Sequence, residues 1–109
     1  MSPSATGPGK AAPLRILIAD DHPVVREGLV TILSLQDDLE VVGQACDGEE
    51  ACRLYDQLRP DILILDLALC SKPEIRMIGA TLPFDRMIPA DGFYEWRKTA
   101  RPKLPSRSL

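Results

Sequence analysis

The stretch that decides the fold reads Leu-Arg-Ile-Leu-Ile-Ala-Asp-Asp over residues 14–21, and a shorter counterpart reads Ile-Leu-Ile-Leu-Asp over residues 62–66. Both are nearly continuous apolar runs closed by acidic residues, a pattern typical of buried strands in a parallel sheet. If the two strands are parallel neighbours, Asp20, Asp21 and Asp66 meet in the crevice where open α/β sheets bind ligands. Such carboxylates repel one another unless protons or a cation neutralise them. The alternative is that Asp20 and Asp21 merely precede a helix and favour its positive N-terminal end.

Helical and extended patterns alternate around these two runs. Pro23 suits the first position of a helix, because its missing N–H would be unpaired there. Gly28, within that helix, is expected to allow close packing on the sheet. The expected elements are a strand over 14–19, a helix from 23 to about 35, a strand over 39–45, a helix over about 49–58 and a strand over 62–65. This βαβαβ order predicts right-handed crossovers and a flavodoxin-like parallel sheet of strand order 2-1-3.

The remainder of the chain differs in composition and charge. Residues 1–69 carry a net charge of −7 and residues 70–109 a net charge of +4, and five of the ten prolines lie in the second part. We expect a disordered tail over 1–13, a partial domain over 14–69, an irregular segment over 70–96 and a disordered basic tail over 97–109. The basic excess indicates either ordinary surface charge or a weak contact of the tail with nucleic acid.

Cysteine content and hydropathy bear on the compartment. The three cysteines, Cys46, Cys52 and Cys70, fit neither a disulfide framework nor a zinc pattern, so we expect small buried residues in a reducing cytoplasm. No apolar run approaches the length of a membrane span, and no signal-peptide pattern is present at the N-terminus. A cytoplasmic protein without a membrane partner is therefore expected.

Residues 14–69 resemble the N-terminal half of a bacterial response-regulator receiver domain, of the kind found in LuxR/NarL-type regulators. The similarity is carried, in matching order and spacing, by Arg15–Leu29, Glu40–Ala45, Asp47–Ala51 and Arg59–Leu67. The resemblance implies a truncated CheY-like fold and a signalling module that is not an enzyme. It also implies Asp66 as the acceptor of a phosphoryl group from a histidine kinase. Mg²⁺ would be positioned by Asp20, Asp21, Asp66 and the backbone carbonyl of Ala68, and His22 would be a helix-entry residue, neither phosphodonor nor ligand.

The resemblance stops after Asp66. Leu69 and Cys70 stand where the family has a Met-Pro pair, and its switch Ser/Thr and phosphate-binding Lys have no identifiable counterpart. Lys72 and Thr81 are present, but nothing in the sequence places them in those roles. The fourth and fifth strands are not identified, so the third strand is expected to form an exposed apolar edge. No helix-turn-helix follows, so no DNA-binding domain is expected.

A second stretch, Arg86–Arg97, is similar to a signature of the SOS-response-associated peptidase (SRAP) family, whose members link covalently to abasic sites in single-stranded DNA. The specific part is Gly-Phe-Tyr-Glu-Trp over residues 92–96, in which Glu95 matches the family's active-site glutamate. The family's N-terminal cysteine is replaced by Ser2, and no histidine follows His22. An apolar patch that covers the truncated sheet is the simpler explanation of the aromatic residues. Two alternatives to a receiver therefore stay open: an abasic-site DNA-binding fragment, and a nonfunctional fusion of two incomplete sequences.

Overall fold

The computed structural model describes residues 12–69, 72–83, 86–93 and 95. Its elements, in chain order, are β1 (Leu14–Ala19), α1 (Pro23–Ser34), β2 (Leu39–Ala45), α2 (Gly48–Leu58), β3 (Ile62–Leu65), the 3-10 turn η2 (Leu67–Leu69), α3 (Pro73–Gly79), β4 (Met87–Pro89) and the 3-10 turn η4 (Ala90–Gly92). The first five elements agree with the expected βαβαβ order. The strand bounds match the predicted ones, and each of the two helices differs from its prediction by one residue at one end.

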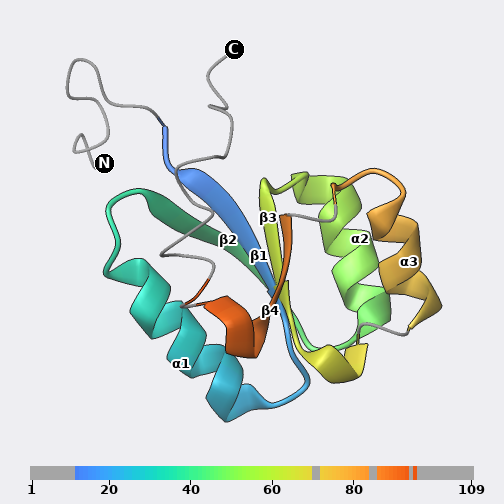
Figure 1. The fold of residues 1–109 in the computed structure, drawn as a ribbon, viewed down its shortest axis with the longest axis horizontal. Coiled ribbons are helices and arrows are strands. Elements are labelled where there is room, and N and C mark those ends of the chain that lie inside the picture. The colour runs from blue at the N-terminus through green and yellow to red at the C-terminus, as the bar shows by residue number, and fades with distance from the viewer. Residues whose placement is uncertain (1–11, 70–71, 84–85, 94, 96–109) are drawn as a thin grey trace.

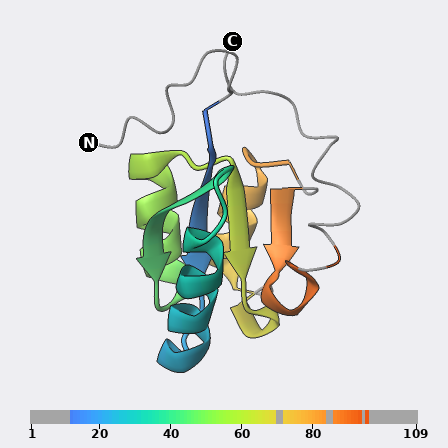
Figure 2. The ribbon, with the colours of Figure 1, turned by 90° about the vertical axis from the view of Figure 1, so that its left-hand side faces the viewer.

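One parallel sheet forms the centre of the fold, with the strand order β2-β1-β3-β4. Figure 2 shows the four strands side by side with their arrows pointing the same way. The predicted order 2-1-3 is confirmed, and β4 is added beyond β3. Because all four strands are parallel, their carboxyl ends share one edge of the sheet.

Helices cover both faces of the sheet, and each face has its own apolar cluster (Figure 1). On one face, α1 and the segment after β4 bury alternate strand residues such as Ile16, Ile18 and Ile64. On the other face, α2 and α3 cover the strand residues that alternate with the first set, such as Leu17 and Leu63. This alternation is expected where both faces of a strand are buried, and it explains why β1 and β3 are apolar almost throughout.

Helix α2 is capped at both ends. The carboxylate of Asp47 accepts from the backbone N–H of Glu50 at 2.8 Å, and Glu50 Oε1 accepts from the N–H of Cys46 at 2.8 Å. These two bonds satisfy donors that a helix start leaves unpaired, as in a capping box. At the other end Arg59 takes a left-handed conformation with φ 46°, and its N–H donates to the carbonyl of Tyr55. The carboxyl end of α2 is thus closed before β3 begins.

The structure adds two elements that the sequence analysis did not find. Helix α3 begins at Pro73 and buries Ile75 and Ile78, and β4 pairs with β3 through Ile64↔Ile88 and its neighbours. The expectation that β3 forms an exposed apolar edge is therefore wrong, because β4 covers that edge. Both elements are short, and their prolines stand at the start of a helix and at the last residue of a strand, where proline is tolerated.

Some smaller expectations also change. An added Cβ at Gly28 would meet no atom within 4 Å, so this residue faces open space and does not pack on the sheet. Cys46 is exposed and Cys52 only partly buried, in contrast to the expected buried thiols. Cys70 and residues 97–109 lie outside the described residues, as do residues 1–11 of the expected N-terminal tail. Across the described ranges, every helix is too short or too polar to span a bilayer.

Candidate functional site

The acidic residues lie at the carboxyl ends of β1 and β3: Asp20 and Asp66 directly follow the strands, and Asp21 follows Asp20. Ala19 pairs with Leu65, and the next N–H, that of Asp66, donates to the carbonyl of Ala19 at 3.0 Å. The N–H of Asp20 likewise donates to the carbonyl of Ala45 in β2 at 3.0 Å. The sheet hydrogen bonding thus continues through both acids and fixes the backbone from which their side chains project.

Asp20, Asp21, His22 and Asp66 form a compact cluster, in which one nitrogen or oxygen of each residue lies within 4.8 Å of the others. The predicted convergence of the three carboxylates is therefore confirmed. The side chain of Asp20 is 3% exposed, that of Asp66 22% and that of Asp21 52%. The cluster thus has a buried base at Asp20, a partly exposed carboxylate at Asp66 whose Oδ2 atom is buried, and a solvent-facing carboxylate at Asp21.

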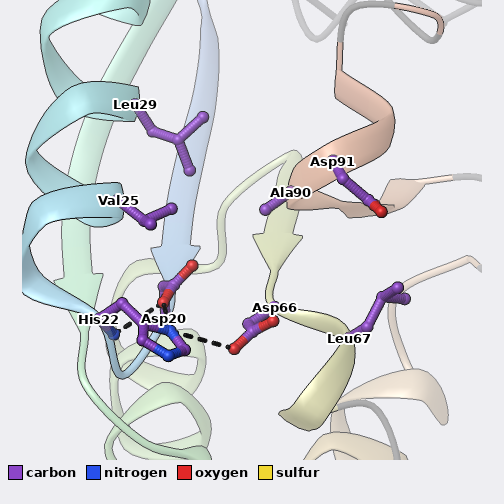
Figure 3. Close-up of a pocket in the computed structure, with 8 residues that line it drawn as sticks. All are labelled: Asp20, His22, Val25, Leu29, Asp66, Leu67, Ala90 and Asp91. Atoms are coloured by element: carbon purple, nitrogen blue, oxygen red, sulfur yellow. Dashed lines mark hydrogen bonds and ion pairs between the residues drawn. The ribbon is translucent and has the colours of Figure 1, made fainter.

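The imidazole of His22 lies among these carboxylates. Its Nδ1 is 3.0 Å from Asp20 Oδ1, 3.0 Å from Asp21 Oδ1 and 3.5 Å from Asp66 Oδ2; Figure 3 shows the ring directed between Asp20 and Asp66. The hydrogen bond to Asp20, followed by the negative charge of Asp21, raises the pKa of His22 above its ordinary value. When protonated, the ring offsets part of the repulsion among the carboxylates.

His22 also occupies the N-cap position of α1, as expected of a helix-entry residue. Its backbone N–H donates to Asp20 Oδ1 at 2.7 Å. One turn further along α1, the guanidinium of Arg26 donates to the backbone carbonyl of Asp20. These contacts hold the β1–α1 loop against the sheet edge. Sequence reasoning missed the ring contact, and the only available signal was the position of the single histidine directly after an acidic pair.

A pocket of about 360 Å³ opens beside the cluster, between α1 and η4 (Figure 3). Its lining residues are Asp20, His22, Val25, Leu29, Asp66, Leu67, Ala90 and Asp91. Four of these eight residues are apolar, Asp20 and Asp66 lie together at one end, and Asp91 adds a carboxylate beside Ala90 (Figure 3). The contribution of η4 could not be foreseen, because the sequence analysis did not find the strand that positions it.

Ala90 is the residue of η4 that lies level with the acceptor candidate. Leu65 pairs with Pro89, and the next residues along the two strands are Asp66 and Ala90. This position therefore presents a methyl group to the pocket and carries no hydroxyl. Thr81 and Lys72 are exposed and lie outside the pocket lining, so neither occupies the role that the sequence left unassigned.

Of the remaining predicted site residues, Glu95 lies apart from the cluster and Ala68 lies beside Asp66. Glu95 is exposed and does not line the pocket, and its aromatic neighbours Tyr94 and Trp96 lie outside the described residues. Phe93 is 2% exposed and packs in the cluster beneath α1 with Ile88. Ala68 follows Asp66 in η2, and its backbone N–H lies 3.4 Å from Asp66 Oδ1. The roles of Ala68 and Glu95 stay predictions.

The donor set of the cluster fits a hard divalent cation. Mg²⁺ prefers oxygen ligands, uses few carboxylates and keeps several waters. Asp20 and Asp66 project from fixed backbone, and Asp21 adds a solvent-facing carboxylate at the same edge. Three carboxylates this close also gain from a positive charge among them. The residues present therefore fit a divalent cation such as Mg²⁺.

Comparison with known proteins gives one family. The family model of the response regulator receiver domain matches residues 16–76. The oxygen regulatory protein NreC of Staphylococcus carnosus is 54% identical over 56 residues, which cover 51% of this chain and 26% of that protein. The chain spans less than a third of the length of such curated relatives.

Solved structures show the same similarity. A two-component response regulator of the LuxR family from Aurantimonas sp. SI85-9A1 matches with a TM-score of 0.59 and 34% identity, over 72% of this chain and 58% of that one. The receiver domain of the putative response regulator NarL from Mycobacterium tuberculosis matches with a TM-score of 0.56 and 25% identity, over 73% of this chain and 86% of that one.

These matches give no support to the SRAP resemblance of residues 86–97. Part of that stretch instead forms β4 and η4, the fourth strand of the sheet and one wall of the pocket. The family model covers more than half of the chain, and it includes every strand end that carries an acidic residue of the cluster. The chain therefore belongs to the response regulator receiver domain family.

Proposed function

We propose that this chain accepts a phosphoryl group on Asp66, with Mg²⁺ held by Asp20, Asp21, Asp66 and the backbone carbonyl of Ala68. The observation that carries the proposal is the convergence of three carboxylates where β1 and β3 end. Receiver domains are generally signalling domains without an enzymatic activity of their own. The proposed event is accordingly a modification of the chain by an external donor.

The three carboxylates differ in exposure in a way that suits different tasks. Asp20 is almost fully buried and is fixed by the N–H of His22, so it suits a permanent ligand. Asp66 has a partly exposed side chain that lines the pocket, so it suits the residue that a donor approaches, although its Oδ2 atom is buried. Asp21 faces solvent and closes the cluster from outside.

Phosphoryl transfer to a carboxylate brings negative groups together. An oxygen of Asp66 forms a bond to phosphorus while the bond from phosphorus to the donor breaks, and the donor leaves with the electron pair. Mg²⁺, when bound, offsets the negative charge that gathers on the phosphoryl oxygens. The chain supplies the nucleophile and a fixed arrangement of ligands, and catalysis by position and charge is what this reaction requires.

The donor that we propose is the phosphohistidine of a histidine kinase, since a receiver implies a phosphodonor of this kind. The partly exposed Asp66 lies at the edge of the sheet beside the exposed start of α1. A protein donor can therefore approach without an opening of the core. A small acyl phosphate can reach the same carboxylate, and it provides a test that needs no cognate kinase.

A second candidate is binding of Mg²⁺ without durable phosphorylation. The specific observation in its favour is Ala90, whose methyl group lies level with Asp66 where no hydroxyl is available to a phosphoryl oxygen. In this case the carboxylate cluster still binds Mg²⁺, but the chain has lost the contact by which a hydroxyl would bind a phosphoryl group on Asp66.

The test is incubation with acetyl phosphate and Mg²⁺, followed by intact mass spectrometry. The proposal predicts one added phosphoryl group that is absent without Mg²⁺ and absent in Asp66→Asn. Asp56→Asn, which changes an exposed aspartate on α2, is the matched control and should keep the modification. No added mass in the wild-type chain, together with binding of Mg²⁺, would favour the second candidate. Added mass that survives Asp66→Asn would remove the acceptor assignment.

A further inference from the structure

We propose that the site favours phosphodonors with an apolar leaving group, and in particular acyl phosphates whose acyl group is aromatic or branched. The leaving group would lie in the pocket between α1 and η4. This inference rests on the proposed function of Asp66, because it concerns the donor from which that residue takes a phosphoryl group.

The pocket is larger than the reacting group needs. Its volume of about 360 Å³ corresponds to roughly a dozen water molecules, and it falls within the usual range of about 300–1,000 Å³ for small-ligand sites. Asp20 and Asp66 form one end. Beyond them the pocket continues between Val25 and Leu29 of α1 and Ala90 of η4, with the carboxylate of Asp91 beside Ala90 (Figure 3). A phosphoryl group beside Asp66 would leave this apolar part free for the rest of a donor.

The reaction geometry directs the leaving group away from the acceptor. In a phosphoryl transfer, the attacking and leaving oxygens lie roughly in line on opposite sides of phosphorus. The oxygen of Asp66 forms its bond to phosphorus as the bond from phosphorus to the acyl oxygen breaks, and the electron pair leaves with a carboxylate product, without proton transfer. An acyl group across from Asp66 thus faces the open pocket, and the apolar side chains there contact its hydrocarbon part.

The residues that line the pocket favour an apolar acyl group over an anionic one. The polar lining consists of three aspartates and His22, and Lys and Arg are absent from the eight lining residues, so an additional anionic group on the donor is disfavoured. Val25, Leu29 and Ala90 offer hydrocarbon surface, and each buried methylene group is worth about a fourfold gain in binding. A donor with an apolar acyl group therefore gains contacts that acetyl phosphate is too small to make.

Two neighbouring valines on α1 provide a matched pair of variants. Val25 lines the pocket and is 45% exposed, whereas Val24 is 81% exposed and outside the lining. Asn at either position has the same effect on helix propensity, and neither change removes a carboxylate of the cluster. Val25→Asn makes the wall polar, and Val24→Asn controls for the general effect of the substitution.

The experiment compares benzoyl phosphate with acetyl phosphate at equal Mg²⁺, with the rate of Asp66 modification followed by intact mass. The ratio of the benzoyl rate to the acetyl rate should fall about fivefold in Val25→Asn and stay unchanged in Val24→Asn. Equal ratios in both variants, with modification still present, would overturn the inference and leave the proposed function standing. Absence of modification from either donor in the wild-type chain would overturn both.

A binding measurement gives a readout that does not depend on turnover. Benzylphosphonate carries a phosphonate and an aromatic group but cannot transfer a phosphoryl group. In the presence of Mg²⁺ it should shift the methyl NMR resonances of Val25 and Leu29 and leave that of Leu35, which is 77% exposed at the far end of α1, unchanged. Shifts confined to residues outside the pocket would overturn the inference.

Discussion

At the scale of single residues, the site consists of three acids that follow strands, the ring of a histidine at a helix entry and the methyl group of an alanine beyond the last strand. Asp20, Asp21 and Asp66 follow from the rule that parallel strands end at one edge, which needs only the strand assignments. The ring of His22 among the carboxylates depends on the direction of a side chain at a helix entry, and no periodicity encodes that. Ala90 reaches the pocket only through β4, so its contribution required the structure.

A single arginine links the start of the first strand to the end of α2. Arg15 donates from its guanidinium to the carbonyls of Leu58 at 2.6 Å and Arg59 at 3.1 Å, and its backbone N–H donates to Asp61 Oδ2 at 2.9 Å. The charged side chain thus pairs carbonyls that the helix leaves unsatisfied and opposes the negative end of its dipole.

Arg15→Met, which keeps the apolar stem, should therefore lower the free energy of unfolding by about 1–3 kcal/mol. Urea denaturation measures the change. Arg53→Met is the matched control, because Arg53 is 60% exposed and its ion pair with Glu50 spans 3.6 Å, so it should cost less than about 1 kcal/mol. Equal losses in the two variants would contradict the assigned contacts.

At the scale of elements, the long segments with clear periodicity were predicted with nearly the correct bounds. β1, β2 and β3 match, and the two crossover helices each differ by one residue at one end. Helix α3 was missed although Ile75, Ile78 and Leu82 recur at helical spacing after a proline at the first helical position. The prolines of this part of the chain favour irregular structure in the sequence analysis, whereas Pro73 and Pro89 stand at element boundaries, where they cost little.

The start of α2 gives a prediction of pH dependence. The N–H of Cys46 donates to Glu50, and this bond lowers the pKa of Glu50 below its ordinary value of 4.5. A carboxyl whose pKa is lower in the folded state stabilises the fold above its unfolded pKa, and this contribution is lost as the pH falls through the folded value.

The stability advantage of the wild-type chain over Glu50→Gln should therefore be full near about pH 6 and shrink below about pH 4. Urea midpoints measured across this range test the prediction. Glu49→Gln removes the neighbouring first-turn charge and controls for the helix dipole. An advantage over Glu50→Gln that is constant with pH would contradict the bond from Cys46.

Gly28 gives a prediction of increased stability. It lies inside α1, an added Cβ there meets no atom within 4 Å, and its backbone is helical. Gly28→Ala should raise the free energy of unfolding by about 0.5–1 kcal/mol, because alanine loses less backbone entropy on helix formation.

Gly43→Ala is the comparison, since a Cβ there would lie 2.8 Å from Leu58 Cδ1 and 3.2 Å from Leu17 Cδ1. Thermal melting of both variants separates the two environments. A loss of stability in Gly28→Ala, or an equal gain in both variants, would show that α1 packs differently at this position.

At the scale of the whole molecule, β4 adds a fourth strand to the sheet and covers the edge of β3. Without it, β3 would be an open apolar edge and the core beneath α1 would lack Ile88 and Phe93. With it, both faces of a four-stranded sheet are covered. A strand of three residues has too short a pattern to be recognised in sequence, and its place is set by pairing with β3 and by burial, which are tertiary effects.

If β4 belongs to the fold, Ile88 is a core residue. Ile88 is 3% exposed and packs with Phe93, so Ile88→Ala should lower the free energy of unfolding by about 2–5 kcal/mol. Met77→Ala, at a position that is 65% exposed on α3, is the control and should cost much less. Urea denaturation followed by circular dichroism measures the free energy of unfolding of both variants. A loss below about 0.5 kcal/mol for Ile88→Ala would show that β4 does not unfold cooperatively with the rest of the sheet.

The most direct test of the central claim is a titration with Mg²⁺ followed by amide NMR. The account predicts saturable shifts at Asp20, Asp21, Asp66 and Ala68 in the wild-type chain, and their loss in the Asp20→Asn variant, with Asp56→Asn behaving as the wild type. Absence of shifts at these amides, or shifts that persist in Asp20→Asn, would contradict the claim that the carboxylates at the ends of β1 and β3 bind a divalent cation.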